Sequence, residues 1–171
     1  FIYIFMIFRH ISVCKISFSS IDKLTIRWFN QKCFISIVKF KLVFYGDIDT
    51  AIGDSIQNAG LGKYTTFHPP VKHEKIIQLM QSADLLLLIG VPNEPGVVTG
   101  KIFEYISTGK PILAVSPVQS DIEHILQETK TGINIPFEDV SNFDNIMSDL
   151  ISFLNTPIDP PSLNQKILKY H

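Results

Sequence analysis

The sequence is poor in several features that would point to particular classes of protein. Its 171 residues include only two cysteines, Cys14 and Cys33, which show no CxxC or metal-type spacing. Two unpaired thiols of a cytosolic protein are therefore expected, rather than a disulfide scaffold or a metal site. There is also no Gly-x-Gly-x-x-Gly loop, no Walker loop and no Ser, His and Asp order that suggests hydrolysis. These absences argue against the common dinucleotide, ATP and metal chemistries.

Positive and negative charges nearly balance over the whole chain, but they are unevenly distributed along it. The net charge is −1, so nothing global indicates binding to nucleic acid. Residues 1–40 nevertheless carry six Lys and Arg against one acid, Asp22, and contain no Gly, Pro, Ala or Glu. This composition leaves two interpretations open: a strand and a helix added to the main sheet with poorer packing, or a basic segment that touches an anionic membrane. The segment lacks a clean amphipathic period.

The chain opens on an apolar run, residues 1–8, without an initiator Met. The run is too short to span a bilayer and lacks the basic residues that precede the apolar part of a signal peptide. We interpret it as a buried strand, with the cut end of a longer apolar segment as the alternative. We expect the sequence to be a fragment of a longer protein.

From residue 41 onward, strand and helix patterns alternate at short spacing. Strands are predicted near 41–45, 64–68, 84–89, 112–115 and 133–135. Helices are predicted near 50–58, 73–82, 99–109, 120–130 and 141–154, with a tail helix near 162–170, and residues 22–40 could form a further helix. Asp49 or Thr50 can cap the helix at 50–58, Ser120 and Glu123 fit a capping box at 120–130, and Gly109 is a suitable glycine to end the helix at 99–109. This alternation is typical of βαβ units, and it predicts an α/β fold with a Rossmann-like parallel sheet and helices on both faces. Ligands of such sheets bind at the carboxyl ends of the strands, where we expect the loops 46–49, 68–73, 90–99 and 116–120. We divide the chain into 1–40, a domain at 41–155 and a tail at 156–171.

The stretch 98–105 follows the most apolar predicted strand and a loop that contains Pro92 and Pro95. A helix that begins near Thr99 presents its first amide groups and its positive dipole end to an anion such as a phosphate. Gly100 permits close approach of the backbone. Glu104 lies one turn further along, where its carboxylate can accept hydrogen bonds from the two hydroxyls of a ribose.

Four stretches carry a family resemblance: 67–74 (FHPPVKHE), 79–88 (LMQSADLLLL), 99–106 (TGKIFEYI) and 109–114 (GKPILA). In this order they resemble the C-terminal domain of GT-B glycosyltransferases, closest to the family 4-like retaining enzymes. The resemblance covers about 40–155. It implies one Rossmann-like half of a GT-B enzyme that binds a nucleoside-diphosphate sugar, while a separate N-terminal domain binds the acceptor.

The resemblance assigns roles to several residues of this chain. Glu104 matches the glutamate that holds the ribose hydroxyls. The backbone of Val98, Thr99 and Gly100 matches the amides around the diphosphate and the sugar, and Lys101 is a candidate phosphate partner. The loop from His68 to Lys72, which includes Val71, matches the segment that lines the nucleobase.

Two departures from the family pattern leave the catalytic residues unassigned. Gly96 stands where the family often has a second glutamate, with Glu94 as the nearest acid. The basic pair that the family places after its first strand is not recognisable, although Arg9, Lys15 or Lys23 could serve.

The predicted function is therefore the donor-binding half of a glycosyltransferase in polysaccharide biosynthesis. It would use no cofactor or metal beyond the nucleoside-diphosphate sugar, and the fragment alone would bind nucleotide without transferring sugar. The expected partners are an acceptor sugar or lipid-linked glycan and the missing N-terminal GT-B domain, with no nucleic acid. We expect a cytoplasmic location, with peripheral contact at the inner membrane face as an option. The alternatives are a nucleotide-sugar epimerase of the same fold and a non-enzymatic, flavodoxin-like interaction domain.

Overall fold

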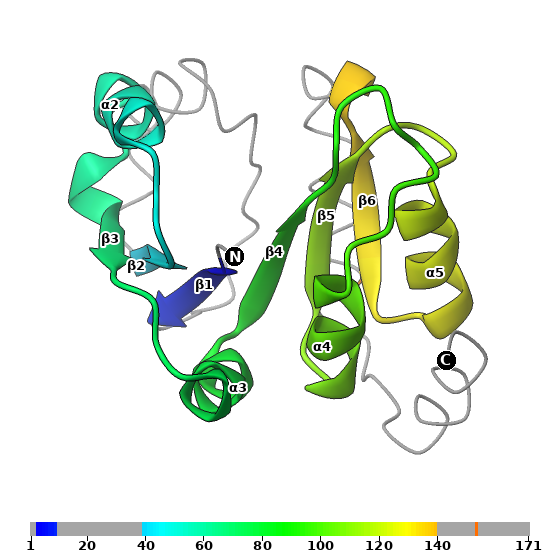
Figure 1. Ribbon diagram of the computed structural model, residues 1–171, viewed down its shortest axis with the longest axis horizontal. Coiled ribbons are helices and arrows are strands. Elements are labelled where there is room, and N and C mark those ends of the chain that lie inside the picture. The colour runs from blue at the N-terminus through cyan, green and yellow to red at the C-terminus, as the bar shows by residue number, and fades with distance from the viewer. Residues whose placement is uncertain (1–2, 10–38, 140–152, 154–171) are drawn as a thin grey trace.

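The structure is a computed structural model that describes residues 3–9, 39–139 and 153. In these residues, six strands form one sheet in the order β3-β2-β1-β4-β5-β6 (Figure 1). The strands are β1 (Tyr3–Arg9), β2 (Lys39–Tyr45), β3 (Thr65–His68), β4 (Leu85–Ile89), β5 (Ile112–Ser116) and β6 (Gly132–Pro136). The helices are α2 (Thr50–Asn58), α3 (His73–Ser82), α4 (Lys101–Ser107) and α5 (Asp121–Thr129), with short 3-10 turns η1 (Gly62–Tyr64) and η2 (Phe137–Asp139).

The five strands predicted from residue 41 onward all run in the same direction. β2 pairs in parallel with β3, and β4, β5 and β6 pair in parallel with one another. β1 lies between β2 and β4 and runs antiparallel to both. The Rossmann-like α/β fold is thus confirmed, and residues 1–40 do add a strand to the sheet, but that strand is reversed.

The reversal of β1 changes where its last residue lies. Arg9 pairs with Lys39, the first residue of β2. An antiparallel strand ends at the edge where its neighbours begin, so Arg9 lies at the edge opposite the carboxyl ends of β2 and β4. The idea that Arg9 follows the first strand as a diphosphate partner is therefore wrong. Lys15 and Lys23 lie outside the described residues.

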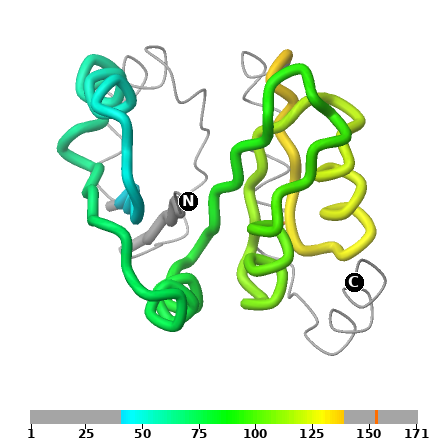
Figure 2. Tube along the Cα trace, viewed as in Figure 1, coloured from blue at the N-terminus to red at the C-terminus, as the bar shows by residue number. Residues whose placement is uncertain are grey.

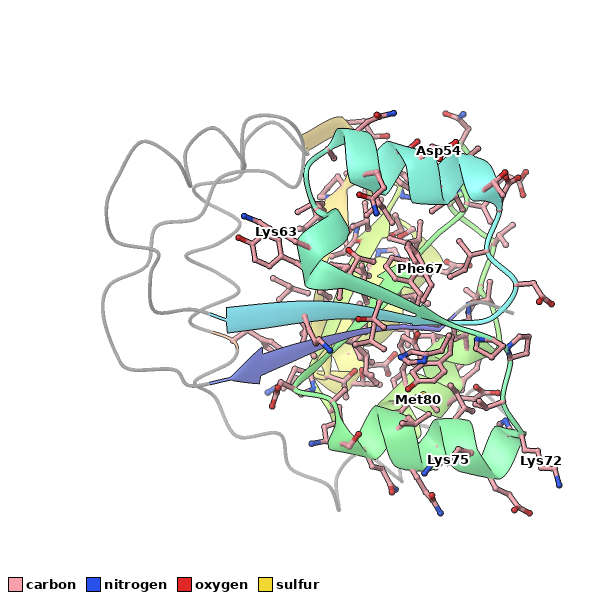
Figure 3. The ribbon with its side chains drawn as sticks, turned by 90° about the vertical axis from the view of Figure 1, so that its left-hand side faces the viewer. Asp54, Lys63, Phe67, Lys72, Lys75 and Met80 are labelled. Carbon is pink, nitrogen blue, oxygen red and sulfur yellow. The ribbon has the colours of Figure 1, made fainter. Side chains whose placement is uncertain are left out.

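Helices cover both faces of the sheet, as predicted. On one face, α3, α4 and α5 pack in a core whose sheet residues include Val43, Leu86, Leu88, Ile112 and Ala114. On the other face lies α2, and the view along the edge of the sheet shows α2 and α3 on opposite sides (Figure 3). The four leucines of β4 are all buried, so this strand is apolar toward both faces, as its sequence predicts.

Local sequence signals set the ends of the helices. The Asp49 carboxylate accepts a hydrogen bond from Ala51 N at 2.9 Å and caps α2. The Ser120 hydroxyl caps α5 by accepting from Glu123 N at 3.2 Å. The Glu123 carboxylate accepts from Gln119 N, one residue earlier than the predicted capping box requires. Gly109, with φ of 67°, ends the turn after α4 as expected.

Several predictions fall partly or wholly outside the described residues. The helices predicted at 141–154 and 162–170 lie there, as does most of the one considered over 22–40. Residues 39 and 40 of that last range belong to β2, so a helix cannot extend to them. The domain boundaries at 40 and 155 stay predictions. Among the described helices, none is both long and apolar enough to cross a bilayer.

Candidate functional site

The loop at 90–100 leaves the carboxyl end of β4 at the point where the strand order reverses. After β1, the strands β2 and β3 are added on one side of β1, and β4 is then added on its other side. Ligands of open α/β sheets bind at such switch points, outside the carboxyl ends of the strands. The trace in Figure 2 shows this loop rising from the end of β4 and descending to α4.

Two consecutive turns give the first part of this loop its shape. Glu94 N donates to Val91 O at 3.3 Å, and Val97 N donates to Glu94 O at 3.2 Å. In the first turn, Pro92 takes the second position and Asn93 the third, with φ of 62°. Proline followed by a residue of positive φ is the signature of a type II turn. The proline-rich loop is therefore a folded structure.

The amide groups available to an anion lie just before α4. Within the described residues, the backbone N–H groups of Val98, Thr99 and Gly100 form no hydrogen bond. The hydroxyl oxygen of Thr99 is also buried without a partner there. By contrast, Ile102 N and Phe103 N already donate to Thr99 O and Gly100 O, at 3.1 and 3.2 Å. The open amides thus belong to the 98–100 backbone. Contrary to the prediction, most N–H groups in the first turn of α4 are already hydrogen-bonded and are not available to an anion.

The start of α4 differs from the prediction by two residues. Gly100 is the N-cap of α4, with φ of −53°, and Thr99 lies outside the helix. A side chain at Gly100 would meet nothing within 4 Å. Neither its backbone conformation nor its protein neighbours require glycine, so the space beside it is open to a ligand.

Lys101 and Glu104 lie on the first turn of α4, and both are half-buried. Burial lowers the pKa of Lys101 below the ordinary lysine value, while the nearby Glu104 carboxylate acts in the opposite direction. A partly desolvated ammonium group attracts an anion more strongly than a fully hydrated one. The structure thus places one cation and one carboxylate beside the open amides.

His68 ends β3 at the same edge of the sheet, and its ring stacks on that of Tyr45 with centroids 4.7 Å apart and planes 14° apart. It lines a pocket of about 390 Å³, with Gly46, Asp47, Ile48, Asp49, Thr50, Gly53, Phe67 and Pro69. Val71 lies just beyond this pocket in the sequence and is 38% exposed. The sequence predicts the loop 46–49 at this edge of the sheet, and its residues line the pocket, but none of them was among the candidate site residues.

The two groups of residues lie at the carboxyl ends of β3 and β4, with β2 and β1 between them. Three strand spacings of about 4.8 Å separate β3 from β4 by roughly 14 Å. An extended nucleoside diphosphate can bridge such a separation. Among the described residues, no group of three or more His, Cys, Asp or Glu could hold a metal ion.

Fold and site together define a Rossmann-like α/β domain with a preformed loop at its switch point. The chain belongs to the family described as glycosyl transferases group 1, whose model matches residues 18–152. This confirms the family resemblance and favours a glycosyltransferase over a flavodoxin-like interaction domain. No match to the chain is found among curated proteins.

Three solved structures are similar to this chain, and the first of them shows the same type of fold. Sucrose-phosphate synthase from Thermosynechococcus elongatus is 16% identical, with a TM-score of 0.55 over 88% of this chain and 38% of that one. WaaG, involved in lipopolysaccharide biosynthesis, is 19% identical with a TM-score of 0.48, covering 75% and 32% of the two chains. Anabaena HepE, solved with UDP-glucose, is 20% identical with a TM-score of 0.45, covering 71% and 35%. The chain spans about a third of the length of each.

Proposed function

We propose that this chain is the donor-binding half of a GT-B glycosyltransferase and binds a nucleoside-diphosphate sugar along the carboxyl edge of its sheet. The observation that carries the proposal is the run of three open amides at 98–100, next to the buried hydroxyl of Thr99, which has no partner in the described part of the chain. Buried polar groups without partners are rare in folded proteins, and one such hydroxyl beside three open amides at a switch point suits a ligand that accepts hydrogen bonds. Family membership supports the same assignment.

Each part of the donor has a candidate partner. The diphosphate accepts hydrogen bonds from the amides of Val98, Thr99 and Gly100 and lies near the Lys101 ammonium group. The ribose hydroxyls donate to the Glu104 carboxylate, and the base lies near His68 and Val71. Amides and a cation that stabilise the charge on a departing diphosphate lower the barrier to glycosyl transfer without a metal.

The acceptor side of the reaction lies outside this half. We propose a sugar or lipid-linked glycan hydroxyl as acceptor, held by an N-terminal GT-B domain, in the cytoplasm or at the inner face of the membrane. Of these points, the cytosolic location is supported by the low cysteine content, since the two cysteines show no CxxC or metal-type spacing.

Calorimetric titration of the chain with UDP, GDP and ADP tests the proposal. We expect one of the three to bind with a stoichiometry of one and no sugar transfer by the chain alone. If none of the three binds, the donor role is refuted and an interaction domain becomes the better account. Product analysis on a protein with both halves separates a transferase from an epimerase.

A further inference from the structure

We propose that the N-terminus of α5 positions the 90–100 loop for diphosphate binding, with the Asp121 backbone N–H and the Ser116 side chain as positioning groups. The proposal rests on the donor-binding function above. Its residues lie outside the donor site itself, on β5 and α5, and would act only through the loop.

The first contact is a hydrogen bond between the loop and the helix. Asp121 N donates to Pro95 O at 2.9 Å. Asp121 is the first residue of α5, so its N–H has no acceptor within the helix. The carbonyl of Pro95 satisfies this N–H and ties the middle of the loop to a fixed element. The open amides begin three residues later, at Val98.

The second contact holds the start of the loop. Gly90 N donates to Val115 O at 2.8 Å, which places the first loop residue against the end of β5. A Cβ at Gly90 would lie 2.7 Å from the Cβ of Ser116, closer than real Cβ contacts allow. The close approach therefore requires glycine at position 90. The loop is held at two points, five residues apart, by the single segment 115–121.

A buried polar network fixes that segment. The hydroxyl oxygens of Ser116 and Ser120 lie 2.7 Å apart, and Ser116 Oγ donates to Asn134 Oδ1 at 2.8 Å. Ser116 is 0% exposed and Ser120 is 1% exposed. Ser120 in turn caps α5, so the network joins β5, β6 and the helix N-terminus. Satisfied buried networks rigidify their surroundings.

The network has a cost that points to a role beyond packing. The Asn134 amide nitrogen is buried and has no partner among the described residues. An unsatisfied buried donor destabilises the fold. This loss of stability would be balanced by a gain in affinity, because a loop on a rigid support loses less conformational freedom when the diphosphate binds.

The test compares two substitutions at one residue. Asp121→Pro removes the N–H that holds Pro95, yet proline is favoured at the first position of a helix. The preceding Ser120 is extended, with ψ of 157°, which suits a residue before proline. Asp121→Ala removes the same carboxylate but keeps the N–H. The difference between the two variants therefore reports the loss of the contact between Asp121 N and Pro95 O, because the proline ring also displaces that carbonyl.

We expect Asp121→Pro to bind whichever of UDP, GDP and ADP binds the wild type about fivefold or more weakly than Asp121→Ala, the loss of about one hydrogen bond. The corresponding nucleoside, which has no phosphate, should bind both variants alike. Hydrogen exchange at Glu94 and Val97, the donors of the two loop turns, should be faster in Asp121→Pro. Equal diphosphate affinities, or equal exchange, would overturn the positioning role even when the wild type binds nucleotide.

Gly90→Ala is an independent variant that perturbs the loop at its first residue, and it can be used if Asp121→Pro fails to fold. Its new Cβ pushes the loop away from Ser116, so we expect weaker binding of the diphosphate but not of the nucleoside. A parallel loss of both would indicate a general structural defect and contradict the proposal. A wild type that binds no nucleoside diphosphate would instead refute the donor role itself.

Discussion

Glu104 provides the sharpest test at the scale of single residues. Glu104→Gln keeps the shape of the side chain but loses its charge and half of its acceptor capacity toward two ribose hydroxyls. We expect nucleoside diphosphate affinity to fall about tenfold, or roughly 1.4 kcal/mol, in a calorimetric titration. A 2′,3′-dideoxy nucleotide should bind the wild type weakly and be insensitive to the substitution. Unchanged affinity for the ordinary nucleotide would leave Glu104 as a simple first-turn acid.

The lowered pKa of Lys101 predicts opposite pH dependences for ligand binding and for stability. Because burial lowers its pKa in the folded chain, the unfolded chain binds more protons between that lowered pKa and the ordinary value. The stability of the wild type should therefore rise with pH through this window, while nucleoside diphosphate binding falls as the ammonium group loses its charge.

Lys101→Met checks both effects. It should weaken diphosphate binding at neutral pH. It should also abolish the loss of binding that the wild type shows as the pH rises toward the ordinary lysine pKa. In chemical denaturation, the variant should lack the rise in stability over the same pH range. If the pH dependence of binding is the same in Lys101→Met and wild type, Lys101 does not contact the phosphates.

At the scale of secondary-structure elements, the start of β6 carries a stability prediction. A Cβ on Gly132 would collide with the backbone carbonyl oxygen of Ile112 on the neighbouring strand. Backbone cannot move aside as a flexible side chain can, so we expect Gly132→Ala to destabilise the fold by about 1–3 kcal/mol.

Gly53→Ala in α2 is the matched control, since its Cβ would meet nothing within 4 Å. Alanine should stabilise this helix by about 0.5–1 kcal/mol. Denaturant midpoints of the two variants give the comparison. Similar stabilities for both would contradict the close packing of β5 against β6.

Signals that act within a few residues made most elements predictable. The caps at Asp49 and Ser120, the positive φ at Gly109 and the apolar run of β4 each depend on local chemistry, and each occurs as predicted. The reversed direction of β1 was not predictable in this way, because strand direction depends on pairing with distant partners. The bond from Asp121 to Pro95 likewise joins segments that only the folded chain brings together.

At the scale of the whole molecule, the described residues form one Rossmann-like sheet with the candidate site residues along one of its edges. The candidate residues on α4 and the preceding loop were identified from their family pattern, and the structure places them beside a folded loop at the switch point. The loops 46–49 and 68–73 were predicted at this edge from the strand pattern, but the pocket that their residues line beside His68 depends on how the folded chain packs them together.

The most direct test of the donor-binding account is an NMR titration of the ¹⁵N-labelled chain with UDP, GDP and ADP. We predict that one of them shifts the amide resonances of Val98, Thr99 and Gly100 most strongly, because those N–H groups would donate to the diphosphate. Smaller shifts should follow near His68 and Val71. If all three nucleotides leave the 98–100 amides unshifted, or shift only residues away from this edge, the proposed donor site is wrong.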